Sequence, residues 1–133
     1  ATSAQYADLA ERYATDTPVE AGDVVMLGGI EEITKCEEAV SDAVFGVVSS
    51  SPAYLMNSEA GNNDTHPAIA LTGRVPVKVR GTGKAGDRIV SAGSGEARVA
   101  AEDEATTFNT LGRLIKDKYN EETALTECVI GVK

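Results

Sequence analysis

Alternating apolar and charged positions give the clearest structural signal in this chain, and they lie in residues 68–80. The valines at positions 75, 77 and 79 alternate with Arg74, Pro76, Lys78 and Arg80, and an apolar stretch precedes them, with a break near Gly73. Successive side chains of a strand point to opposite faces, so this pattern is typical of a strand with one buried and one exposed face. We predict a strand over 68–80 whose valines face the core.

Shorter apolar runs bounded by Gly, Asp and Pro residues predict further strands. Gly28-Gly29 and Gly93-Ser94-Gly95 lie between such runs and predict two hairpin turns. The predicted strands are 24–27, 30–36, 44–50, 68–80, 88–92, 96–101, 111–116 and 125–132. The predicted core consists of Val24, Val25, Ile33, Phe45, Val47, Ile69, Leu71, Val75, Val77, Val79, Ile89, Val99, Leu114, Val129 and Ile130.

The segment 6–13 has a different pattern. Tyr6, Leu9, Ala10 and Tyr13 recur at helical spacing, which predicts a short N-terminal helix. Eight residues are too few to exclude an extended segment that joins a sheet, so both interpretations stay open.

One sequence unit occurs twice. Ala21-Gly22-Asp23 precedes a predicted strand, and Ala85-Gly86-Asp87 precedes another 64 residues later. A hydrophobic-Gly-hydrophobic step follows each turn, at Gly46 and at Gly112. A turn and two strands used twice predict an all-β fold, a small β barrel or sandwich built from two similar halves.

The length of 133 residues suits one domain with one core. We assign 1–20 to an N-terminal segment and 21–133 to a single β-barrel domain. Because the chain starts at Ala1 without Met, we expect a fragment of a longer protein, and a processed product is the alternative.

The charge restricts the partners. Twelve basic residues against 21 acidic ones give a net charge of −9, which disfavours nucleic acid and anionic membrane surfaces. No apolar run approaches the roughly 20 residues that span a bilayer, and the first residues lack the features of a signal peptide.

Residues that could carry chemistry are sparse. His66 is the only histidine, which excludes a multi-histidine metal site, and we interpret it as a solvated loop residue and not as the base of a Ser58–His66–Asp64 set. Asp23 and Asp87 could form a paired-carboxylate site, but an aspartate after a turn glycine is more often a backbone cap.

The glycine-rich turns lack the spacing of a phosphate-binding loop. Cys36 and Cys128 are expected to be buried free thiols, with a disulfide as the alternative. We therefore predict no catalytic residue, no cofactor and no metal ligand, and expect the protein not to be an enzyme.

Two surfaces are candidates for contact with other molecules. The irregular stretch 52–67 carries the apolar residues Tyr54, Leu55 and Met56 among polar ones, and such exposed clusters often mark a contact. The basic residues Arg74, Lys78 and Arg80 share the outer face of the predicted strand 68–80. They form either a solvated face or a surface complementary to the acidic loops of a neighbouring subunit.

Four segments occur together in an order that resembles a known group of proteins. They are Tyr6-Ala7-Asp8-Leu9-Ala10-Glu11-Arg12-Tyr13, Gly22-Asp23-Val24-Val25, Gly46-Val47-Val48-Ser49-Ser50-Ser51-Pro52-Ala53-Tyr54-Leu55-Met56-Asn57 and Ala70-Leu71-Thr72-Gly73-Arg74-Val75-Pro76-Val77-Lys78-Val79. The order resembles the C-terminal domain of virion structural and tail-fibre-like proteins of tailed phages, especially T-even-like myoviruses and cyanophages. A more distant similarity is to the self-cleaving chaperone domains of trimeric phage appendages.

The resemblance implies a non-catalytic structural domain in the virion. It would be the terminal knob of an appendage, serving assembly or host attachment as part of a homotrimer. Its partners would be other virion proteins and a host surface receptor. The alternatives are a capsid-surface decoration protein, an autoproteolytic or chaperone domain, and a sugar-binding module, which the lack of tryptophan disfavours.

Overall fold

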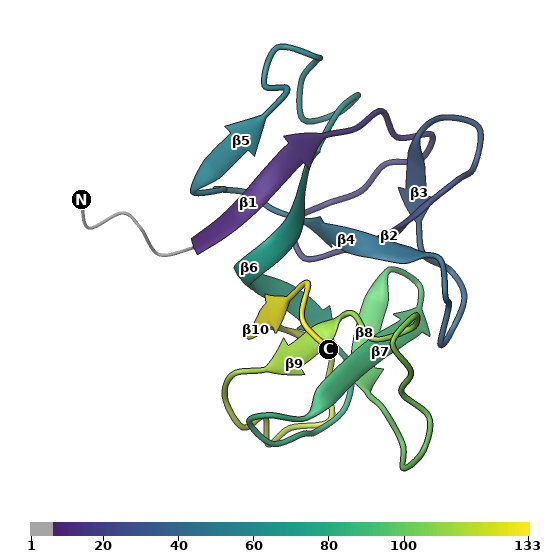
Figure 1. Cartoon of the computed structure of the whole chain (residues 1–133), viewed down its shortest axis with the longest axis vertical. Coiled ribbons are helices and arrows are strands. Elements are labelled where there is room, and N and C mark those ends of the chain that lie inside the picture. Colours follow the sequence, from purple (N-terminus) through teal and green to yellow (C-terminus); the bar gives the residue numbers. More distant parts are fainter. Residues whose placement is uncertain (1–6) are drawn as a thin grey trace.

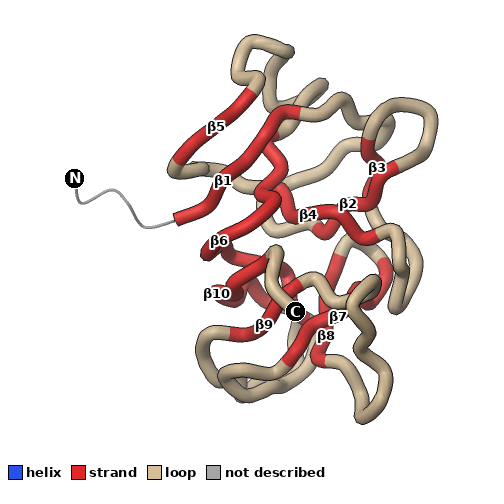
Figure 2. Tube along the Cα trace, in the orientation of Figure 1, coloured by secondary structure: helices blue, strands red, loops and turns tan. Residues whose placement is uncertain are grey.

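The computed structural model describes residues 7–133, and it is built from strands alone (Figures 1 and 2). No described segment forms a helix that could cross a membrane. The strands are β1 (Ala7–Arg12), β2 (Val24–Leu27), β3 (Ile33–Lys35), β4 (Val44–Val48), β5 (Tyr54–Met56), β6 (Ala68–Val79), β7 (Arg88–Gly93), β8 (Glu96–Val99), β9 (Gly112–Leu114) and β10 (Ala124–Ile130).

Five strands of the C-terminal half close into a barrel. β6 pairs with β10, β10 with β9, β9 with β7, and β7 with β8, and each of these pairs is antiparallel. The barrel closes where β8 returns to β6 as a parallel pair, with Val79 opposite Ala97. A closed barrel leaves its strands with few open edges.

The N-terminal half repeats this order strand for strand. β1 pairs with β6, β6 with β4, β4 with β2, and β2 with β3, and all four pairs are antiparallel. A single parallel bridge between Thr15 and Ile33 then joins the end of the β1 segment to β3. The first half therefore uses β1 where the second uses β6, and β6 where the second uses β10.

The two Ala-Gly-Asp turns have the same hydrogen bonds, as two similar halves require. Gly22 N–H donates to Val48 O at 2.9 Å, and Gly86 N–H donates to Leu114 O at 2.8 Å. The carboxylates of Asp23 and Asp87 each accept a backbone N–H three residues earlier, at 2.8 and 2.9 Å. Both aspartates therefore cap backbone groups, as the turn interpretation predicts.

β6 belongs to both halves, and Gly73 lies where its two roles meet. Residues 68–74 pair with β1, and residues 73–79 pair with β10. Gly73 has φ of +110°, and a Cβ at this position would overlap the carbonyl of Ala7. Only glycine combines this conformation with such a close strand crossing.

The predicted core is largely confirmed, and the deviations follow from strand register. Phe45, Leu71 and Val99 are half-buried and pack at the margin of the core. Val129 is also only half-buried, because alternation on β10 places Cys128 and Ile130 inside. Both cysteines are buried free thiols, as expected, and no disulfide joins them.

The N-terminal half decides one open interpretation and differs from the sequence prediction in two places. For the described residues of the segment 6–13 the extended interpretation holds: β1 extends over 7–12, because strand pairing with β6 outweighs a weak helical spacing. The return strand predicted over 30–36 is confined to β3, because residues 28–32 form the hairpin loop. Tyr6 lies outside the described residues. The long loop 52–67 contains the three-residue strand β5, which was predicted as irregular.

Val77 tests the register of β6. Its side chain is fully buried, so Val77→Ala should lower the free energy of unfolding by about 1–3 kcal/mol through lost burial and a cavity. Arg74→Ala on the same strand removes a side chain that is 48% exposed and should change stability by less than about 0.5 kcal/mol. Urea unfolding of both variants is the measurement, and equal losses would show that the register is wrong.

Candidate functional site

Tyr54, Leu55 and Met56 form β5, which adds to the outer edge of β1. The two strands run parallel, with Leu9 opposite Tyr54 and Glu11 opposite Met56. Leu55 and Met56 are half-buried, whereas Tyr54 is 64% exposed. The apolar cluster is therefore divided: two residues pack back onto the domain, and the tyrosine ring projects into solvent.

Arg12 holds the rest of this loop in place. Its guanidinium donates to Ser58 O at 3.1 Å, to Asn63 Oδ1 at 2.9 Å and to His66 O at 2.7 Å. Asp8 fixes the start of the loop, since its Oδ1 accepts the N–H of Ala53 at 3.2 Å. The loop is thus shaped by side chains of β1, and it presents Tyr54 from a fixed position.

Tyr13 has an internal role. Its ring packs edge-on against Phe45, with centroids 5.1 Å apart, and its hydroxyl donates to Glu11 at 2.7 Å. Burial, followed by the hydrogen bond to Glu11, raises the pKa of Tyr13 to about 12. This residue belongs to the margin of the core and not to a contact surface.

Arg74 and Lys78 of β6, and Arg80 directly after it, all have partners within the chain. Arg74 lies 3.2 Å from the carboxylate of Glu127, and Arg80 lies 2.8 Å from that of Glu96. Lys78 donates to the carboxylates of Glu20 and Asp23. These three side chains are therefore engaged in ion pairs within the same domain.

The Lys78 contact connects the two halves. The Lys78 N–H donates to Gly22 O at 3.0 Å, and its Nζ lies 2.7 Å from Oδ1 of Asp23, a residue that is only 1% exposed. Burial alone would lower the pKa of Lys78, but the hydrogen bonds to Asp23 and Glu20 outweigh it and raise that pKa. Lys78 thus neutralises a buried carboxylate at the joint.

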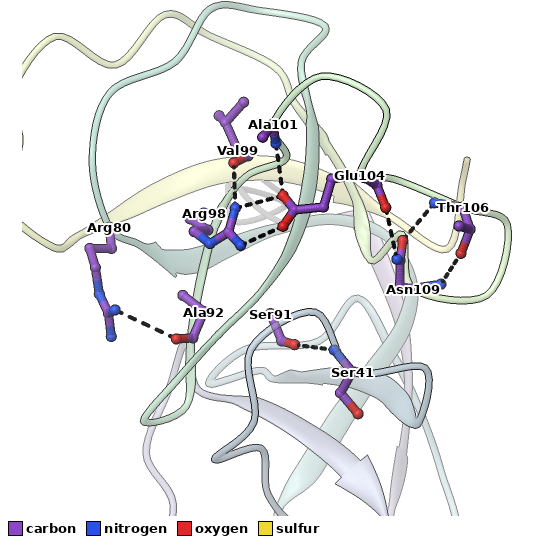
Figure 3. A network of polar contacts seen from close by, with 10 residues as sticks. All are labelled: Ser41, Arg80, Ser91, Ala92, Arg98, Val99, Ala101, Glu104, Thr106 and Asn109. Atoms are coloured by element: carbon purple, nitrogen blue, oxygen red, sulfur yellow. Dashed lines mark hydrogen bonds and ion pairs between the residues drawn. The ribbon is translucent and has the colours of Figure 1, made fainter.

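The tip of the β7–β8 hairpin is the second part of the joint, and sequence reasoning did not find it. Gly95 forms hydrogen bonds through both its N–H and its C=O to backbone groups of the first half. Val24 N–H donates to Gly95 O at 2.7 Å, and Gly95 N–H donates to Cys36 O at 2.9 Å. Ser91 Oγ accepts the N–H of Ser41 at 2.9 Å beside this contact (Figure 3).

An ion pair organises the loop after β8. The guanidinium of Arg98 makes two hydrogen bonds of 2.8 Å to the carboxylate of Glu104, which also accepts the N–H of Ala101 (Figure 3). The Arg98 bond first, and then the Ala101 bond, lower the pKa of Glu104 to about 2. Asn109 extends the network by donating to Glu104 O at 3.1 Å.

Groups that could carry out chemistry are not brought together. His66 contacts Thr65 at 3.0 Å, and its side chain makes no hydrogen bond with Ser58 or Asp64 within residues 7–133. Over the same range, no group of three or more His, Cys, Asp or Glu side chains could hold a metal ion.

Comparisons with known proteins give similarity in fold. No protein-family model and no curated protein matches the sequence. Among solved structures, the premature form of gene product 12 of bacteriophage phi29 matches with a TM-score of 0.66 and 15% identity. That match covers 97% of this chain and 22% of the other. A C-terminal fragment of the same phage protein matches with a TM-score of 0.63 and 16% identity, over 95% of this chain and 100% of the fragment.

Lys78→Met tests the joint. The change keeps the length of the side chain but leaves the buried Asp23 carboxylate without its cation, so we expect a loss of about 2 kcal/mol of unfolding free energy. Arg80→Met is the matched control, because Arg80 is 46% exposed and its pair should contribute less than about 0.5 kcal/mol. Denaturant midpoints give both values, and an equally small effect at both positions would contradict the role of Lys78.

The low pKa of Glu104 predicts that the loop after β8 is destabilised in acid. Because its folded-state pKa lies below the ordinary 4.5, its stabilising contribution is complete above that value and is lost as the pH falls towards about 2. A carboxyl NMR titration should give a pKa of about 2, and Arg98→Gln should return it towards 4.5. A wild-type value near 4.5 would show that the ion pair does not persist in solution.

Proposed function

We propose that this chain is a non-catalytic structural domain of a phage virion appendage. It acts as the terminal knob of a homotrimeric fibre or similar structure, with contacts to other virion proteins or a host receptor. The observation that carries this proposal is the fold: the whole described arrangement matches a bacteriophage protein over 95–97% of the chain. The order of the sequence segments, which resembles phage virion proteins, supports it independently.

The chemistry of the surface is consistent with such a role. Arg74, Lys78 and Arg80 are engaged in ion pairs inside the domain, and the net charge of −9 favours solubility. Tyr54 projects from an anchored loop, and tyrosine is enriched in protein interfaces because it offers a large rigid contact area. We place the contact between subunits at this loop.

An autoproteolytic or chaperone domain is the second candidate, and one observation favours keeping it. Asp8 is only 3% exposed, and its Oδ2 has no hydrogen-bond partner among the described residues. A buried carboxyl group with an unpartnered oxygen can serve as a general acid or base. A capsid decoration protein is the third alternative.

Locating the domain separates these functions. Antibodies against the purified domain should label the ends of appendages on intact particles in electron micrographs. Label spread over the capsid would support a decoration protein. Absence of the domain from purified particles, with its presence in the infected-cell lysate, would support a domain that is cleaved off during assembly. Either of the last two results would refute the terminal-knob assignment.

The contact surface has its own test. Tyr54→Ser in the full-length parent protein should reduce trimer formation or host adsorption by at least about tenfold, because it removes an exposed aromatic anchor. Tyr119→Ser is the control, since Tyr119 is 82% exposed and lies in the C-terminal half, away from β5. Native mass spectrometry and adsorption counts provide the measurements. Equal behaviour of the two variants would remove Tyr54 from the interface.

A further inference from the structure

The second Ala-Gly-Asp turn has open backbone groups at the place where the first turn holds a hairpin tip. In the first half, Cys36 N–H donates to Val24 O at 2.9 Å, and in the second half Ala100 N–H donates to Arg88 O at the same distance. A regular antiparallel pair would add the reciprocal bond from Arg88 N–H to Ala100 O. That bond is not formed among the described residues. On the other edge of β7, Arg88 lies opposite Arg113, next to the hydrogen-bonded pair of Asp87 and Leu114, so its N–H points away from β9 and towards Ala100.

The first half shows what such an opening accepts. Its equivalent groups, Val24 N–H and Cys36 O, are bridged by the peptide of Gly95. A Cβ on Gly95 would lie 3.1 Å from Oδ1 of Asp23 and 3.1 Å from Cγ of Lys35, so glycine fits best. Lys78 completes the contact by placing its ammonium group against the same Oδ1 of Asp23. The first Ala-Gly-Asp turn therefore binds a glycine turn and a cation at the same place.

The opening in the second half is a surface hollow with acidic surroundings. It is lined by Gly86, Asp87, Arg88 and Val99 to Ala101, with Glu102 and Asp103 at its margin. Oδ2 of Asp87 accepts the N–H of Lys84, whereas Oδ1 accepts no hydrogen bond from the described part of the chain. The loop after β8, which forms one wall of the hollow, is fixed by the Arg98–Glu104 pair (Figure 3).

We propose that this hollow binds the β-hairpin tip of a partner protein. The tip inserts a glycine peptide between Arg88 N–H and Ala100 O, and a lysine or arginine of the partner pairs with Asp87. The proposal rests on the internal repeat and is independent of the proposed function, beyond which it goes. It adds a second interaction surface, in the half opposite to β5.

Charge decides against a second copy of this chain as the occupant. The equivalent hairpin tip of the first half spans residues 28–32 and carries Glu31 and Glu32. These carboxylates would face Asp87, Glu102 and Asp103. Like charges at an interface disfavour a pairing, whereas a basic tip is attracted to the same surface.

Amide hydrogen exchange of the free domain gives the first test. Val24 N–H is bonded to Gly95 O, so it should exchange at least about tenfold more slowly than the open Arg88 N–H. Comparable protection of both amides would overturn the proposal, because Arg88 would then have a partner inside the domain.

A peptide that copies the known occupant gives the second test. The probe is a disulfide-closed hairpin with the sequence of residues 91–97, in which lysine replaces Glu96. We expect saturable NMR shifts at Arg88 and Ala101, slower exchange of Arg88 N–H, and a dissociation constant of about 1 mM, because two backbone bonds offset little of the entropy of association. Val24 should not respond, since Gly95 already covers it.

Two matched controls make the result specific. The same peptide with Gly95→Val should bind at least about tenfold more weakly, since a β-branched residue cannot enter so narrow a site. The Asp87→Asn domain retains an oxygen for Lys84 N–H, so its fold should be kept, and its affinity for the lysine peptide should fall about threefold or more.

Three results would overturn the proposal: no shift at Arg88, equal binding of the valine peptide, or an unchanged affinity of Asp87→Asn. A fourth concerns the occupant. If Arg88 shifts with protein concentration in the absence of peptide, and Glu31→Gly changes that response, a second copy binds there and the partner assignment is wrong.

Discussion

β6 belongs to both halves of the domain, and its close crossing with β1 at Gly73 is the constraint on which the rest of the structure depends. The strand gives residues 68–74 to β1 and residues 73–79 to β10, so Gly73 and Arg74 pair on both edges. The backbone of β1 passes so close to Gly73 that no side chain fits, and the positive φ bends the strand between its two roles. The two halves consequently share a strand instead of meeting only through side chains.

This shared strand determines which charged side chains and turns join the two halves and which ones remain accessible. Lys78 and the Gly95 tip are used to join the halves, and they occupy the first Ala-Gly-Asp turn. No hairpin tip of the described chain contacts the second turn in the same way, so Arg88 N–H and Ala100 O remain open. β5 and the Arg12-anchored loop are an addition that the C-terminal half lacks. The two surfaces that we propose for contacts thus lie in opposite halves, while the groups between them join the halves.

The sequence predicted the repeat because its signals are local. The Ala-Gly-Asp turns, the two hairpin glycines and the alternation of Val75, Val77 and Val79 act within a few residues, and each lies where expected. It could not predict the partners of Arg74, Lys78 and Arg80, since these come from residues 16 to 58 positions away. The choice between helix and strand for 6–13 stayed open for the same reason: the pairing of β1 with β6 is a long-range contact, whereas the helical spacing is a local pattern. β5 is a three-residue strand in a polar loop, without periodicity of its own.

The account claims that β6 makes both halves one cooperative unit, and Gly46→Ala tests this directly. A Cβ at Gly46 would lie 2.5 Å from Ala70 O, so the direct clash lies in the N-terminal half. Thermal unfolding followed by NMR at Val25 and at Ile89 should give one shared midpoint in the wild type and one shared, lower midpoint in the variant, with a ratio of calorimetric to van't Hoff enthalpy of about 1. A variant in which Ile89 keeps its wild-type midpoint while Val25 unfolds earlier would contradict the claim.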